Sequence, residues 1–290
     1  MPGTTLYVPH AINFASGTDL TQLDALEPDF GLEGFRVHSA SEVLPGFSGN
    51  MFSRPVLAMQ TTQIKDVLDK TTLDNVAIGY AATNTYLEFR LVASLTGRAA
   101  IAATSNLRLR SANALLSWNS ISARMGQLAT INFTFLPISD GTNAPLVYTG
   151  GVAITGTSAV QAVFEVGLVD LNGTDLCAQG VEINTNLTYF ERRCAGSPYL
   201  EYVAVDKGFI TIDIDVEDST VPMAMLPAGS ALSSLSVWLR KKAASGINVA
   251  NATAEHILIS GSVGTVRPMG PKKFQVELHS VSVATTSAIT

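Results

Sequence analysis

The densest group of side chains that could do acid–base or metal chemistry is a short acidic cluster: Asp213, Asp215, Glu217 and Asp218. Carboxylates two residues apart on a β-strand share one face, where they could hold a cation or serve as acid and base. A catalytic pair also needs a companion group from elsewhere in the chain. Ile212, Ile214 and Val216 alternate with the acids, which is typical of an amphipathic strand with a solvated face. We therefore expect Asp213, Asp215 and Glu217 to face a polar lumen.

No other pattern of residues predicts catalysis, a cofactor or a metal ion. The chain has no G-x-S-x-G, no phosphate-binding G-x-x-x-x-G-K-[ST] and no G-x-G-x-x-G. Its histidines are scattered, without an H-x-x-x-H pair or a neighbouring cysteine: His10, His38, His256 and His279. We predict no catalytic, cofactor-binding or metal-binding residues, and a protein that is not an enzyme.

The cysteines and the apolar runs bear on where the protein is made. Cys177 and Cys194 are too few for a disulfide framework and lack C-x-x-C spacing, so we expect reduced structural thiols and leave their pairing open. No run approaches the roughly 18 apolar residues of a membrane span, and the start has no signal-peptide layout. We therefore expect that the protein does not associate with a membrane. We also expect that it assembles in the cytoplasm.

The composition predicts self-association. Charged residues make up 14% of the chain, against about 25% in a typical soluble domain, and the hydrophobic set reaches 47%. A surface this poor in charge favours contact with further copies of the chain. The net charge of −6 excludes a general attraction to nucleic acid, although it suits a surface that DNA passes without binding.

Two β-hairpins are predicted after an N-terminal arm or loop at residues 1–55. The first joins 75–80 to 86–92 through a turn at Thr83 and Asn84. The second joins 199–205 to 209–217 through a tip at Asp206, Lys207 and Gly208. Both tips are candidates for contacts between stacked subunits.

A helix is predicted after each hairpin, at 111–125 and 228–245. Ser111 can cap the first helix, and Gly126 and Gly246 can end the two helices in a left-handed conformation. The landmarks of the two segments keep a constant offset of 120 residues: Leu115 and Leu235, Trp118 and Trp238, Gly126 and Gly246. This offset predicts a tandem duplication into domains 56–172 and 173–290. The expected fold is mainly β, with two tandem β-sandwich or barrel domains, each flanked by one α-helix.

The segment 181–189, Val-Glu-Ile-Asn-Thr-Asn-Leu-Thr-Tyr, resembles a motif of the tail tube proteins of long-tailed bacteriophages. The resemblance covers mainly residues 173–290, and residues 64–69 of the first half lack the asparagines. It implies small β-sandwich or barrel domains with a flanking helix, arranged in rings of six domains that stack into a DNA conduit. With two domains in each chain, the ring would be a trimer with pseudo-sixfold symmetry or else a hexamer.

The resemblance also implies partners and a location. The partners would be further copies of the chain and other virion proteins, while double-stranded DNA would pass without specific binding. The location would be the virion. Two other functions fit the composition: another virion shell component such as a double-domain β capsid protein, and a carbohydrate-binding or adhesive β module. Aromatic residues are only 7% of the chain, which disfavours the adhesive module.

Overall fold

The computed structural model describes residues 6–13, 19–20, 23–29, 32–37, 47–53, 55–70, 85–92, 106–111, 113–152, 162–217 and 233–290. The predicted turn at Thr83 and Asn84, and the whole of the first arm of that hairpin at 75–80, lie outside these residues.

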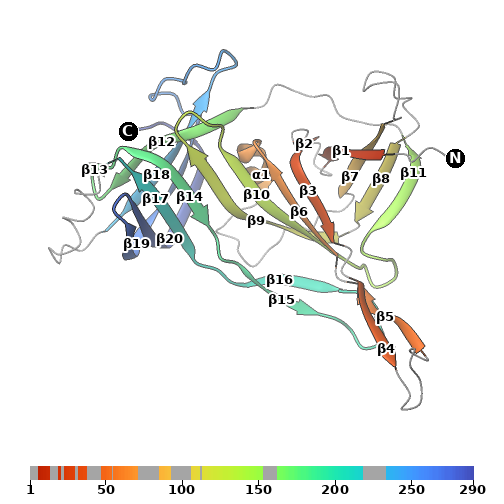
Figure 1. Ribbon diagram of the computed structural model, residues 1–290. Coiled ribbons are helices and arrows are strands. Elements are labelled where there is room, and N and C mark those ends of the chain that lie inside the picture. Colours follow the sequence, from red (N-terminus) through yellow and green to blue (C-terminus); the bar gives the residue numbers. More distant parts are fainter. Residues whose placement is uncertain are drawn as a thin grey trace.

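One large antiparallel sheet dominates the fold and confirms a mainly β protein (Figure 1). Its eleven strands lie in the order β13 (Thr174–Asp175), β12 (Val163–Leu171), β18 (Leu235–Lys242), β19 (His256–Gly270), β20 (Lys273–Ser287), β17 (Ile210–Val216), β14 (Ala178–Asn184), β9 (Asn113–Arg124), β10 (Thr130–Ile138), β6 (Val56–Thr61) and β3 (Leu23–Asp29). A second sheet has the order β11 (Val147–Val152), β8 (Asn106–Ser111), β7 (Thr85–Val92), β1 (Leu6–Asn13) and β2 (Asp19–Leu20).

The main sheet curls, so that β12 returns toward β9 and β14. The Ala129 amide, in the turn after β9, donates to the Phe164 carbonyl of β12 at 2.7 Å. The inner face of the curl holds the main hydrophobic core, which includes Trp118, Phe133 and Phe164, all less than 2% exposed.

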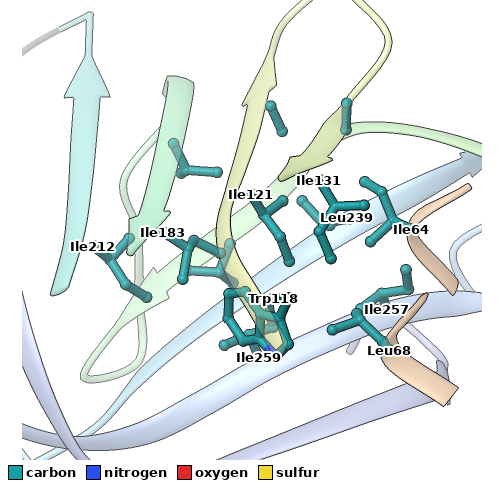
Figure 2. Close-up of a cluster of buried hydrophobic side chains, with 14 of the residues drawn as sticks. Ile64, Leu68, Trp118, Ile121, Ile131, Ile183, Ile212, Leu239, Ile257 and Ile259 are labelled. Carbon is teal, nitrogen blue, oxygen red and sulfur yellow. The ribbon is translucent and has the colours of Figure 1, made fainter. Parts of the chain in front are cut away.

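A short helix, α1 (Ile64–Lys70), packs its apolar side into this core. Ile64, Val67 and Leu68 are at most 3% exposed, and Figure 2 shows Ile64 and Leu68 among side chains of the surrounding strands. Lys65 and Asp69 form an ion pair on the outer side of the helix at 2.6 Å. The helix therefore fills the concave side of the sheet.

Two long hairpins leave the main sheet at one end. In the first, the pairing of β14 with β17 continues as β15 (Thr188–Arg192) with β16 (Tyr202–Lys207). In the second, the pairing of β3 with β6 continues as β4 (Leu32–Val37) with β5 (Phe47–Ser53). Figure 1 shows both outer halves extending away from the end that carries β13 and the C-terminus.

The predicted helices are wrong, because 113–124 and 235–242 are the strands β9 and β18. A β-bulge in β9 leaves Asn119 without a register partner in β10, so Leu116 and Trp118 before it and Ile121 after it all reach the core. The resulting spacing of three residues imitates the apolar stripe of a helix. The predicted flanking helices are therefore absent from these two segments.

The residue pairs that are 120 positions apart in the sequence were predicted to be equivalent, but the leucine and tryptophan pairs have different surroundings. Trp118 lies in the main core, whereas Trp238 donates its indole N–H to the Ala288 carbonyl at 3.1 Å on the other side of β18. Leu115 belongs to a separate small cluster, while Leu235 belongs to the main core. Gly126 and Gly246 do adopt positive φ, at 75° and 80°, but each lies in the turn after a strand.

The predicted domain boundary between 172 and 173 falls in the turn from β12 to β13. Strands from both sides of it pair in one sheet, as β14 does with β9 and β18 does with β12. The described parts of residues 1–55, which were predicted as an arm or loop, include the strands β1 to β5, of which β3 extends the main sheet and β1 and β2 extend the second.

Candidate functional site

The acidic strand predicted at 209–217 is β17 (Ile210–Val216), and its two faces differ as its alternation implies. Ile212 and Ile214 are fully buried in the core and Val216 is 2% exposed. Asp213 and Asp215 lie on the opposite face and Glu217 follows the strand in an exposed position. The amphipathic pattern is therefore confirmed, with a polar outer face opposite an apolar inner face.

The polar character of β17 continues across its neighbours. The strand register aligns polar side chains in two rows on the outer face. One row is Arg267, Gln275, Asp213, Glu182, Ser122 and Thr130. The other is Thr265, Glu277, Thr211, Asn184, Ser120, Asn132 and Gln60. We call these two rows, together with Lys273, Asp215 and Arg124 at their edge, the polar face.

Ion pairs and hydrogen bonds hold the acidic part of the polar face in place. Asp213 accepts hydrogen bonds from Gln275 Nε2 at 2.8 Å and from Lys273 Nζ at 3.0 Å. The hydrogen bond that Lys273 donates to Asp213 raises the pKa of Lys273 above its usual value. Arg124 Nη2 lies 3.8 Å from Asp215 Oδ2, a looser and more exposed pair. The strand predicted to be an acidic surface thus has one cation on the neighbouring strand β20 and another on β9, two strands away.

Apart from Glu182, Glu277 and Arg267, the rest of the polar face is uncharged, and part of it is hydrogen-bonded within itself. Asn132 donates to Ser120 at 2.9 Å, and Gln60 donates to Thr130 at 3.3 Å. These side chains are partly exposed and belong to three neighbouring strands, β9, β10 and β6. These four residues include no nucleophile–base pair. They present uncharged hydrogen-bonding groups on the surface of the three strands.

The outer half of the first long hairpin, residues 188–207, forms an arm with two unlike faces. On the inner face, Tyr189 and Val203 pack on Leu115 and Leu136 of the main sheet. Tyr189 Oη is 2.7 Å from Ser117 Oγ, and the Ser139 amide donates to the Leu200 carbonyl at 2.7 Å. Burial raises the pKa of Tyr189. The arm is therefore attached to the outside of β9 and β10.

The outer face of the arm is aromatic and exposed. Phe190 and Tyr202 are 54% and 44% exposed, and their rings meet edge to face with centroids 6.3 Å apart. The Arg192 guanidinium lies over the Tyr202 ring, 5.5 Å from its centroid. Within the described residues nothing covers this face.

The predicted hairpin at 199–217 has the right strands and the wrong pairing. β16 pairs with β15, and β17 pairs with β14 and β20, so β16 and β17 are not partners. Asp206 and Lys207 end β16 and Gly208 lies at the bend before β17, where an added Cβ would be 2.5 Å from Leu187 Cδ2. The end of the hairpin is 193–201. Gly196, Ser197 and Pro198 mark it in the sequence as a turn, a signal that the prediction missed.

The cysteines and the described histidines form no cluster. Cys177 and Cys194 are free and exposed, and a hydrogen bond with Glu201 raises the pKa of Cys194. His256 is fully buried, with Nδ1 accepting from the Lys241 amide at 3.1 Å and Nε2 at 3.0 Å from the Ala250 carbonyl. Among the residues that the structure describes, no group of three or more His, Cys, Asp or Glu is placed to hold a metal ion.

Comparison with models of known protein families gives no match, and a search of curated proteins gives none either. In the described part of the chain, no helix has the length and apolarity needed to cross a membrane.

Proposed function

We propose that this chain is a structural virion protein, a subunit of a phage tail tube that assembles with copies of itself into stacked rings around a DNA conduit. The observation that carries the proposal is the main sheet with its two unlike faces. One face buries the core, and the other presents two rows of polar side chains across seven strands, from β19 to β6. Such a face suits the wall of a water-filled channel.

The charge of the polar face fits the passage of DNA. Four carboxylates, Glu182, Asp213, Asp215 and Glu277, share it with Arg124, Arg267 and Lys273. The basic side chains are spread among the acids, so they form no patch of the kind that neutralises phosphates. A duplex moving along this wall would meet little net attraction.

The form of the molecule supports assembly from copies of one chain. Two long hairpins leave the main sheet at one end, and the arm carries an aromatic face that the described part of its own chain leaves open. Interfaces between unlike surfaces of identical subunits generate rings or filaments. The proposal covers a trimeric or a hexameric ring, with other virion proteins as further partners.

Negative-stain electron microscopy of the purified full chain tests the proposal. The expected image is rings seen end-on and tubes of uniform width seen from the side. Shells or flat sheets would favour a capsid protein instead. A homogeneous monomer across the accessible protein concentrations would contradict any self-assembling function.

A further inference from the structure

The arm and the opposite end of the main sheet have surfaces that complement each other. At that opposite end, two neighbouring hollows of about 660 and 720 Å³ share Gln179 and Glu217 in their linings. The first hollow also contains Asp215 and Met269, and the second contains Met125. We call this pair of hollows the end hollow.

The arm and the end hollow cannot meet within one chain. Gln179 lies at the start of β14, and the arm begins after β14 ends. From Gln179 to Arg192 is 13 residues of nearly continuous strand, or up to about 43 Å at a rise of ~3.3 Å per residue. The arm also leaves the sheet in the direction away from β13, as Figure 1 shows. Contact between the two surfaces therefore needs a second copy.

The chemistry of the two surfaces is matched. Met125 and Met269 are 61% and 56% exposed at the end hollow, and methionine packs well against aromatic rings at adaptable surfaces. Phe190 and Tyr202 supply exposed rings on the arm, and Arg192 places a cation beside them. The end hollow is mixed in charge: Lys272 and Lys273 line it beside Asp215 and Glu217, and Arg124 pairs with Asp215, so Glu217 is the carboxylate that would meet Arg192. An aromatic pair with an adjacent Arg is the composition typical of residues that dominate binding energy.

We propose that the aromatic face of the arm of one copy binds the end hollow of a second copy. Because donor and acceptor lie at opposite ends, the contact is head to tail and adds copies along one direction. The inference deepens the proposed function, since stacking of this kind would lengthen a tube, and it rests on that function for its biological setting. The contact itself needs no ring.

A complementation experiment with the full chain tests the contact. One variant, Phe190→Ala with Tyr202→Ala, removes the arm face, and another, Met269→Ala with Glu217→Lys, alters the end hollow. All four side chains are partly or fully exposed, so both variants should fold with unchanged circular dichroism. In analytical ultracentrifugation each variant should associate at least tenfold more weakly than wild type. Their mixture should form one-to-one dimers, because one intact contact remains.

A charge exchange provides the second measurement. Arg192→Glu and Glu217→Arg should each weaken association, and the double variant should recover most of the loss. Tyr148→Ala is the matched control, because Tyr148 is also exposed, at 55%, but lies on β11 of the second sheet. It should leave association unchanged.

The outcomes separate this inference from the proposed function. Head-to-tail dimers without tubes would support the contact and contradict the tube. Tubes that form equally well from the arm variant, or a mixture of the two variants that stays monomeric, would overturn the contact. Wild-type protein that does not associate at any concentration tested would overturn both.

Discussion

The two halves of the first long hairpin are both antiparallel strand pairs, but their surroundings differ. The inner half, β14 with β17, has further strands on both sides, and Ile183, Ile212 and Ile214 are fully buried. The outer half, β15 with β16, forms a two-stranded sheet that packs on one side and exposes Phe190 and Tyr202 on the other. Two strands alone are marginally stable in water. The inner half is therefore stabilised on both sides by neighbouring strands, whereas the outer half exposes the surface to which we propose that a second copy binds.

Shortening a buried side chain of the inner half should give the largest difference in stability between the two halves. Ile212→Ala leaves a cavity in a fully packed site and should lower the free energy of unfolding by about 3 kcal/mol. Phe190→Ala in the outer half should change it by less than about 0.5 kcal/mol, because Phe190 is 54% exposed. Urea unfolding of both variants measures the difference. Equal losses would show that the arm belongs to the same cooperative unit.

Loss of the arm's anchor should have the next largest effect. Leu200 is 2% exposed in the small cluster between the arm and the main sheet, so Leu200→Ala should weaken arm attachment by about 2 kcal/mol. Hydrogen exchange should accelerate in 188–207 and stay slow in β17. Acceleration that spread evenly through both halves would contradict separate stabilities for them.

Two glycines provide a matched pair with a smaller effect. Gly126 follows β9 in the body with φ of 75°, and Gly196 lies at the end of the arm with φ of 93°. An added Cβ would meet no atom within 4 Å at either position, so the cost is backbone strain of about 1 kcal/mol. Gly126→Ala should lower the global stability by this amount. Gly196→Ala should change only the rate of hydrogen exchange in the arm. An equal loss of global stability in both variants would contradict separate stabilities for the arm and the body.

The smallest effect concerns pH and the ion pair on the polar face. The hydrogen bond that Lys273 donates to Asp213 raises the pKa of Lys273. The contribution of this pair to the free energy of unfolding is therefore fully present below the unfolded pKa of lysine and is lost as pH rises through the folded pKa. Lys273 is 39% exposed, so the contribution should be under about 1 kcal/mol. Asp213→Asn should flatten the decline in stability above about pH 10. An unchanged slope in that variant would remove Asp213 as the partner.

Local alternation along the chain was enough to predict β17 and its two faces, because each residue's neighbours in sequence decide which side it occupies. The pairing of β16 was not predictable in this way, since its partner β15 is fixed by a turn at 193–201 and by packing on Leu115 and Leu136. The helix expected at 111–125 failed for a related reason. Both a bulge at Asn119 and burial on two faces erased the period of two in β9.

The polar face was only partly predictable. Asp213 and Asp215 stood out by their density, while Ser120, Ser122 and Asn132 are ordinary residues whose common face depends on the register of separate strands. The same holds for Lys273 and Arg124, which moderate the acidity expected from the sequence. Register joins residues far apart in the chain, and no local pattern encodes it.

Cryo-electron microscopy of the assembled protein tests the central claim, that the polar face of the main sheet lines a channel. We expect a tube in which Glu182, Asp213, Ser122 and their rows face the lumen and the core faces away from it. A tube whose lumen is lined by another surface, with the two rows of the polar face buried between subunits or turned outward, would contradict it.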